Sequence, residues 1–419
     1  MGKQLAAEHR GQPHLPLNAK ECTPVQKTSL PRDWPLFKRL YHAYNLWTSA
    51  SSGAIPGRNL AVDAFRGLTI ALMIIVNNPG SYLYVYHPLQ HSRWHGCTLA
   101  DFVFPSFLLI VGISIAFSLA SRTKTVANRY SLIKSACVRS AKLFCLGLLA
   151  NNFPFYNIHE WRIPGVLQRI AIVYCISVLI ALKCSTRSIV WIVMILLVGY
   201  WGVLSLIPVP GIGAPNLSLP TANIAAWLDH KLMGAYLYNS AAGWDPEGLL
   251  STIPATCLSL IGILVGKLLI RSDSFDKKIH TLFISGLILA ASGSLWSALF
   301  PFNRWLWTSS FMLFASGLGL LVLSVCTLIT YRSRIAIILY PFIILGSNAI
   351  VIYLCSSIFS RVLYSINIHD INMHDFIHNS LFASWLSTPN ASLCWAIAYT
   401  LTMFMLSYLL YIKRITIKI

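Results

Sequence analysis

Residues 102–121 read FVFPSFLLIVGISIAFSLAS, a run without a single charged side chain. About 20 helical residues cross the ~30 Å hydrocarbon layer of a bilayer, so this run predicts a membrane-spanning helix. The chain is 56% hydrophobic and 11% charged, whereas about a quarter of the residues of soluble proteins are charged. We therefore predict an all-α, polytopic membrane helical bundle of about ten transmembrane helices. The other predicted spans are 60–77, 134–152, 166–183, 188–207, 249–270, 279–299, 305–330, 335–360 and 392–412.

The basic residues predict how the bundle is oriented. Ten spans put both termini on one side, and that side receives 26 of the 32 Lys and Arg residues while the other receives 6. Because positive charge collects on the cytoplasmic side of membrane proteins, both termini are predicted to be cytoplasmic. The net charge of +19 is then explained by the excess of basic residues on the predicted cytoplasmic side. Nucleic acid is not expected as a partner, and membrane lipids with anionic headgroups are the natural counter-charges.

The ends and the cysteines add little chemistry. Residues 1–57 are polar and rich in Pro and Lys, without the apolar segment that a secretory signal needs. We interpret them as a poorly ordered cytoplasmic arm, followed by a transmembrane domain at 58–419. None of the ten cysteines are spaced as CxxC, so neither a metal site nor a disulfide framework is expected.

Titratable side chains gather on the predicted outer side. Imidazoles change charge near neutral pH, so a group of them at the mouth of a bundle is typical of a proton-transfer site. The alternative is that outer loops are wet and tolerate polar residues. The histidines on this side are His87, His91, His95, His159, His230, His369, His374 and His378, and the acids are Asp101, Glu160, Asp229, Asp245, Glu247, Asp370 and Asp375.

The first outer loop is the most informative of these segments. Asn77-Asn78-Pro79-Gly80 is a turn signal that ends a helix and leaves carboxamides at its mouth. Asp101 opens the next span, where the helix dipole favours a carboxylate that can also orient a nearby imidazole. An ordinary helix cap is the competing interpretation of Asp101.

Several motifs follow one another along residues 58–412. They are Val62-Asp63-Ala64-Phe65-Arg66-Gly67, the helix end Val76-Asn77, His91-x-x-Trp94-x-Gly96, Asp101-x-Val103-Phe104-Pro105, Arg162-Ile163-Pro164-Gly165-Val166-Leu167-Gln168-Arg169, Trp244-Asp245-Pro246-Glu247-Gly248-Leu249-Leu250, Asn303-Arg304-x-Leu306-Trp307-Thr308-Ser309-Ser310 and Gly346-Ser347-Asn348-Ala349-Ile350. Together they resemble the motifs of transmembrane acetyltransferases typified by heparan-alpha-glucosaminide N-acetyltransferase. Arg304 stands where a lysine is commoner in that family, and the Asn77 to His91 loop is longer than in the animal enzyme. No large extramembrane domain precedes the second span, so we expect a minimal prokaryotic-type member in a bacterial inner membrane, its active site facing the periplasm.

The resemblance implies transfer of an acetyl group from cytoplasmic acetyl-CoA, a co-substrate, to the amine of a glucosamine-type amino sugar on the far side, with no metal. It implies that His91 is the catalytic histidine, as general base or acetyl carrier, and that Asn77 accompanies it; Asp101 completes the predicted catalytic set. Arg169 is expected to meet an acid such as Asp245 or Glu247, or the anionic CoA. The predicted cofactor-binding residues are Arg162, Gln168, Arg169, Asp245, Glu247, Asn303, Trp307 and Asn348, with Arg66 and the basic inner loops as candidates for the CoA phosphates.

Other interpretations stay open from the sequence. Asp245-Pro246-Glu247-Gly248 is also a good helix start, and Trp307 also suits an interfacial aromatic belt. Ten spans with polar ends also suit a transporter for amino sugars or cell-wall fragments, although no internal repeat is evident. A structural scaffold, O-acetylation of a glycan and a homodimer are further alternatives.

Overall fold

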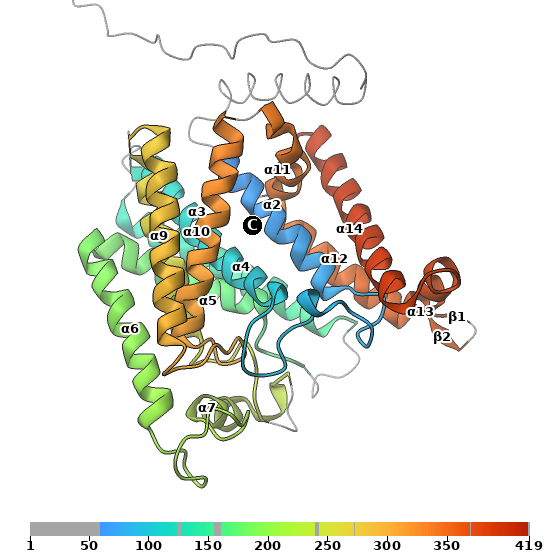
Figure 1. Cartoon of the computed structure of the whole chain (residues 1–419), viewed down its shortest axis with the longest axis horizontal. Helices are drawn as coiled ribbons and strands as arrows, with labels where there is room; N and C mark the ends of the chain where they lie inside the picture. The colour runs from blue at the N-terminus through green and yellow to red at the C-terminus, as the bar shows by residue number, and fades with distance from the viewer. Residues whose placement is uncertain are drawn as a thin grey trace, which may run out of the picture. The chain divides into compact units, whose positions relative to one another are not determined.

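The computed structural model describes residues 59–123, 128–154, 161–238, 243–271, 273–332, 334–368 and 370–417. This described part is almost wholly helical, and its sheet is a short antiparallel hairpin of β1 (Asn367–Ile368) and β2 (Ile371–Asn372) (Figure 1). The arm predicted at residues 1–57 lies outside the described residues, as do His159, Glu160 and His369.

Eight helices of the described part are long and apolar enough to cross a membrane. A bent pair supplies a ninth candidate span, and α4 (Arg129–Asn152) is long enough but carries Lys134, Arg139 and Lys142 and is more polar. The described part therefore confirms an all-α polytopic bundle with eight or nine candidate spans, and α4 lies where the remaining predicted span was expected. The eight helices are α2 (Leu60–Asn77), α3 (Val103–Thr123), α5 (Val166–Lys183), α6 (Thr186–Leu206), α8 (Thr252–Ile270), α9 (Phe275–Trp296), α10 (Ser309–Arg332) and α14 (Thr388–Ile412).

Short elements connect the spans at the end of the bundle that carries the predicted site. The turn η2 (Leu99–Phe102) leads into α3, and α7 (Ile224–Met233) lies between α6 and α8. The helix α13 (Met373–His378) follows the hairpin and leads towards α14. In Figure 1, α13, the hairpin and α14 lie at the opposite edge of the described bundle from α6 and α9.

Local side-chain contacts explain the bounds of α2. Asn59 caps its start, because its Oδ1 accepts hydrogen bonds from the backbone N–H groups of Ala61 at 3.1 Å and Val62 at 3.3 Å. At the other end the Asn78 carboxamide donates to the carbonyl of Ile74 at 2.8 Å, and Pro79 follows. The helix therefore runs from Leu60 to Asn77, the range that the sequence predicts.

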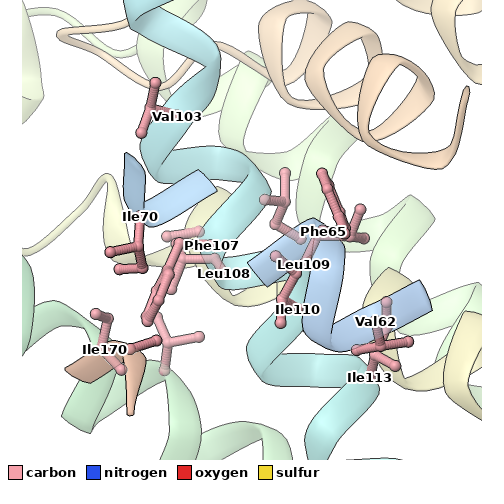
Figure 2. Close-up of a cluster of buried hydrophobic side chains, with 14 of the residues drawn as sticks. Val62, Phe65, Ile70, Val103, Phe107, Leu108, Leu109, Ile110, Ile113 and Ile170 are labelled. Carbon is pink, nitrogen blue, oxygen red and sulfur yellow. The ribbon is translucent and has the colours of Figure 1, made fainter. Parts of the chain in front are cut away.

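The core forms where α2 crosses α3 and α5. Figure 2 shows Val62, Phe65 and Ile70 of α2 packed among side chains of α3, with Ile170 of α5 beside them. The same helix α3 packs closely along α8, where glycines take the place of larger residues. A Cβ at Gly112 would lie 1.9 Å from the carbonyl oxygen of Ser259, so the two backbones touch, as small residues allow between membrane helices.

The predicted span 335–360 is broken. The helices α11 (Tyr340–Ser347) and α12 (Ala349–Ser365) meet at an angle of 73°. Gly346 packs against the α2 backbone, where a Cβ would lie 2.1 Å from the Asp63 carbonyl oxygen. Asn348 sits at the break and holds the end of the described chain, donating to the Ile415 carbonyl at 3.0 Å and accepting from the Ile417 N–H at 3.0 Å. Tertiary contacts therefore position the break.

Candidate active site

A small cavity, which we call the histidine cavity, collects residues from segments far apart in the chain. It has a volume of about 50 Å³. His91 and Asp101 come from the first loop, Asn77 from the end of α2, Glu247 from the turn before α8, and Arg304 from the turn before α10. The remaining lining is largely apolar and includes Met73, Val76, Val103, Phe104, Val166, Trp307 and Phe311.

The two central side chains of this cavity are in contact. His91 Nδ1 lies 2.8 Å from Asp101 Oδ1. The other carboxylate oxygen, Asp101 Oδ2, accepts hydrogen bonds from the N–H groups of Thr98 at 2.9 Å and Ser92 at 3.2 Å. The Asp101 side chain is fully buried, so it is held from several directions and fixes the imidazole. The cap residue of η2 is Thr98, not Asp101 as the competing interpretation had it; Asp101 completes the capping box from the third position of the turn and also contacts His91.

This contact determines which histidine nitrogen is available. A carboxylate on Nδ1 favours the tautomer that carries its proton there and leaves a lone pair on Nε2. His91 Nε2 has no hydrogen-bond partner among the described residues, and the side chain is 32% exposed. Burial lowers the pKa of the His91 imidazole below its usual range; the hydrogen bond to Asp101 opposes that shift and the nearby Arg304 adds to it. His91 is therefore suited to be a neutral base at neutral pH.

The turn before α10 presents Arg304 to the same cavity. Asn303, fully buried, accepts a hydrogen bond from the Leu306 N–H at 2.9 Å, and Trp307 adopts a positive φ of 53°. Arg304 Nε lies 3.5 Å from Asp101 Oδ1, and its guanidinium stacks 4.2 Å from the centre of the Trp305 ring. Asn303 thus shapes the turn, whereas Trp307 lines the cavity.

Arg162, not Arg169, pairs with the predicted acids. Arg162 donates to both oxygens of Asp245, at 3.1 and 2.8 Å, and to Glu247. Burial disfavours the Arg162 charge, but Glu247 and Asp245 outweigh it and raise the pKa of the guanidinium. The expected contact of Arg169 with Asp245 or Glu247 is therefore wrong, because Arg162 holds both carboxylates. The other expectation for Arg169, a contact with anionic CoA, stays a prediction.

Arg169 and Gln168 lie deeper, beneath this ion-pair network. Arg169 is 1% exposed and donates to the Gly248 carbonyl at 2.8 Å and to the Ser251 hydroxyl, while its guanidinium lies 4.7 Å from the centre of the Trp307 ring. Gln168 is buried, and its amide atoms have no hydrogen-bond partner among the described residues. Neither residue lines the histidine cavity. Arg169 instead contacts Gly248, Ser251 and Trp307, and Trp307 is one of the residues that line the cavity.

A much larger cavity, of about 800 Å³, opens beside the opposite halves of the same helices; we call it the basic cavity. Arg139 Nε is buried there without a hydrogen-bond partner among the described residues, and Asn348 lines the wall with Ile417 of the terminal segment. None of its described lining residues is acidic. Its charged and hydroxyl-bearing lining residues are Arg66, Ser114, Ser118, Ser121, Arg122, Ser131, Lys134, Ser135, Arg139, Lys142 and Ser347, together with Tyr174.

The two cavities follow one another along α2, α3 and α5. On α3, Phe104 lines the histidine cavity and Phe107 lines the basic cavity, a rise of about 4.5 Å along the helix. On α2, Asn77 and Arg66 line the two cavities and lie roughly 16 Å apart along the axis. A ligand that spans both cavities would therefore run along the inside of the bundle.

Arg304 and most of the basic cavity are not predicted as site residues from the sequence. Arg304 stands out there only as a departure from a family motif, because its contact with Asp101 joins positions about two hundred residues apart. Lys134, Arg139 and Lys142 fall within the predicted span 134–152, and the structure places them on α4, where they line the basic cavity.

Comparison with known proteins agrees with the motif resemblance. Residues 58–297 match the family model described as heparan-alpha-glucosaminide N-acetyltransferase, catalytic. The chain is 30% identical over 377 residues to the human heparan-alpha-glucosaminide N-acetyltransferase, covering 74% of this chain and 54% of the human protein. The mouse enzyme of that name is 30% identical over 358 residues, covering 70% of this chain and 52% of the mouse protein. The chain thus spans about half the length of these curated relatives, and it belongs to the heparan-alpha-glucosaminide N-acetyltransferase catalytic family.

Proposed function

We propose that this protein is a transmembrane N-acetyltransferase that moves the acetyl group of acetyl-CoA to the amine of a glucosamine-type sugar. The observation that carries the proposal is the contact of 2.8 Å between His91 Nδ1 and Asp101 Oδ1 at the histidine cavity. The names of the relatives support the acetyl group and the amino-sugar acceptor. The basic cavity at the other end of α2 supports the choice of an anionic donor.

The acceptor amine explains the need for a base. An amino sugar arrives protonated at neutral pH and cannot attack until it loses that proton to the solvent. As the neutral amine attacks the thioester carbonyl carbon, its nitrogen must lose a second proton. His91 Nε2, which has no hydrogen-bond partner among the described residues, takes this proton, and Asp101 stabilises the imidazolium that results. The tetrahedral intermediate then collapses, and the C–S bond breaks to release CoA. The proton held by His91 is available to the leaving thiolate.

Asn77 fits the role of a neutral hydrogen-bond donor to the carbonyl oxygen. It lines the same cavity as His91, and α2 ends at this residue. One such donor stabilises a developing oxyanion by about 3 kcal/mol. A second route, in which His91 Nε2 first accepts the acetyl group and then transfers it to the amine, uses the same residues.

The basic cavity suits the nucleotide part of acetyl-CoA. The 3′-phosphate and pyrophosphate are anionic and need cations, while the pantetheine arm is long and uncharged. Lys134, Arg139 and Lys142 on α4 and Arg66 on α2 face this cavity, and the buried, unpartnered Arg139 Nε is a donor in need of an acceptor. The arm would then pass Phe107 and Phe104 of α3 to bring the thioester to His91.

The proposal places the two cavities towards opposite sides of the membrane. The helix ends around the basic cavity adjoin the segments richest in Lys and Arg, which are expected to be cytoplasmic. Donor and acceptor then enter from opposite faces, and the protein transfers an acetyl group across the bilayer without moving either substrate across it.

Purified protein tests the proposal directly. Incubated in detergent micelles with [¹⁴C-acetyl]-CoA and glucosamine, it is expected to form labelled N-acetylglucosamine. The alternative of amino-sugar transport is checked in proteoliposomes with labelled glucosamine. Accumulation of unmodified sugar without acetyl-CoA, together with no acetylated product, would overturn the proposed function.

A further inference from the structure

Arg304 is a buried cation that the proposed reaction has not yet used. Its side chain is 19% exposed, and its Nε faces Asp101 Oδ1 at 3.5 Å. Its Nη1 is buried and has no hydrogen-bond partner within the described part of the chain. A guanidinium carries five N–H donors and stays charged in proteins, so the donors on Nη1 are left without an acceptor.

Such a group is costly unless something completes it. Buried polar groups are almost always hydrogen-bonded, and a buried charge needs a partner of opposite sign. Asp101 supplies part of the charge but shares its Oδ1 with His91 at 2.8 Å. The remaining donors of Arg304 therefore suit an oxygen atom that carries negative charge and enters the cavity from outside.

The position of Arg304 indicates which oxygen that is. Asp101 Oδ1 contacts both His91 and Arg304, so the imidazole and the guanidinium converge on one point, and both line the histidine cavity. That cavity, of about 50 Å³, suits a small group such as an acetyl thioester, whereas phosphates suit the basic cavity. A base and a cation beside one small group match the needs of acyl transfer, in which negative charge develops on the carbonyl oxygen.

On the basis of the proposed function, we infer that Arg304 is a catalytic residue that binds the thioester oxygen of the donor and stabilises the oxyanion. When the amine nitrogen bonds to the carbonyl carbon, the C=O π electrons move to the oxygen, which Arg304 and Asn77 hold. When the C=O bond reforms, the C–S bond breaks and its electrons leave with the sulfur. The proton removed from the amine by His91 balances the thiolate, so amine and thioester become amide and thiol.

The surroundings hold Arg304 in place before any ligand arrives. The Trp305 ring lies 4.2 Å from the guanidinium carbon and is itself fixed, because its Nε1 donates to the Ser92 carbonyl at 2.9 Å. Ser92 in turn donates its N–H to Asp101. A donor fixed in this way needs no rearrangement during the reaction, which is where electrostatic catalysis gains most.

Chemical rescue is the test. Arg304→Ala is expected to lower kcat by about 10²- to 10³-fold, the usual loss for one oxyanion donor, with the KM for acetyl-CoA nearly unchanged. Added guanidinium ion should restore part of the activity, whereas urea, which has the same shape without the charge, should not. Lys231→Ala removes an exposed cation of α7 and should leave kcat unchanged. Arg304→Ala with normal kcat, or equal rescue by urea and guanidinium, overturns the inference.

An acceptor that carries a carboxylate tests whether Arg304 binds the oxyanion or instead binds the acceptor. Glucosamine and muramic acid both carry the amine, but only muramic acid carries a carboxylate. Oxyanion binding predicts the same loss of kcat for both acceptors in Arg304→Ala. A loss confined to the KM for muramic acid would instead make Arg304 an acceptor-binding residue and overturn the inference.

Two further results keep the test decisive. If Arg304→Ala does not fold, Arg304→Met keeps the length of the side chain without its charge and is expected to lower kcat with the KM for acetyl-CoA unchanged. Arg304→Lys, which retains the cation, is expected to keep most of kcat. A normal kcat in Arg304→Met, or an effect on that KM alone, overturns the inference. Wild-type protein is assayed alongside: absence of acetyl transfer in the wild type counts against the proposed function, whereas transfer in both proteins at equal rates counts only against Arg304.

Discussion

His91 Nδ1 lies 2.8 Å from Asp101 Oδ1, and the Asp101 carboxylate is fully buried. A buried carboxylate that accepts from an imidazole fixes both the orientation of the ring and the nitrogen that carries the proton. This contact leaves the lone pair on His91 Nε2, the atom to which the proposed reaction assigns the role of base. In the proposed reaction, the rate depends on a residue that never touches the substrate.

Asp101→Asn tests this positioning role. An amide can donate to Nδ1 and so favour the wrong tautomer, so we expect a fall in kcat of at least about 10²-fold. Asp101 also raises the pKa of His91 through its charge and hydrogen bond; its removal should shift the acid limb of the pH–rate profile to lower pH. The measurement is kcat across the pH range with saturating acetyl-CoA.

The chain offers a matched control for that variant. His374 Nδ1 lies 2.9 Å from Asp375 Oδ1, a similar contact that does not line the histidine cavity. Asp375→Asn should therefore leave both kcat and the acid limb unchanged. Equal losses in the two variants would indicate a general effect on folding and argue against a special role for Asp101.

Arg139→Gln tests whether the basic cavity binds the phosphates of acetyl-CoA. Arg139 lines the basic cavity with a buried, unpartnered Nε. Loss of a charge-assisted hydrogen bond to phosphate should raise the KM for acetyl-CoA by about tenfold or more, with kcat little changed. Lys277→Gln removes an exposed cation that pairs with Asp273 outside the cavity, and its KM should match the wild type. A normal KM for acetyl-CoA in Arg139→Gln would contradict the proposal that the CoA phosphates bind in the basic cavity.

The buried carboxyl of Asp229 on α7 should make the free energy of unfolding depend on pH. Burial is the largest influence and raises the pKa of its carboxyl from 3.8 to about 7. Between these values the folded protein holds a proton that the unfolded chain releases, so the free energy of unfolding falls as pH rises through this window. The melting temperature in detergent should drop between about pH 4 and about pH 7.

Asp229→Asn isolates this effect. The amide keeps an oxygen for the Leu249 N–H, which the carboxylate accepts at 2.8 Å, but it cannot ionise. The variant should be more stable than the wild type at alkaline pH and should lose most of the pH dependence. A wild-type slope that persists in Asp229→Asn would assign the effect to another group.

Local signals were sufficient to predict most of the spans. α2 runs from Leu60 to Asn77 as predicted, because a cap, an apolar run and an Asn-Pro turn all lie within its own sequence. The break at Asn348 was not predicted: it depends on Gly346 packing against Asp63 and on the terminal segment, contacts that no local pattern encodes. The tolerance of α4 for Lys134 and Arg139 likewise depends on a cavity formed by several helices.

The candidate site was predictable in part for the same reason. His91 and Asp101 lie ten residues apart in one loop, so their proximity follows from the chain itself. Which of Arg162 and Arg169 pairs with Asp245 depends on how α5 and the turn before α8 pack together, so the expectation from sequence named Arg169 where the structure has Arg162. Arg304 reaches Asp101 only through the tertiary fold.

The most direct test of the account is acetyl transfer by His91→Gln. The variant keeps a hydrogen-bonding side chain but has no titratable base, and binding of acetyl-CoA, which rests on the basic cavity, should be retained. We predict that transfer from [¹⁴C-acetyl]-CoA to glucosamine falls by about 10²- to 10⁴-fold, the usual contribution of a general base, with the dissociation constant for acetyl-CoA unchanged. Transfer at the wild-type rate by a folded His91→Gln protein would contradict the account.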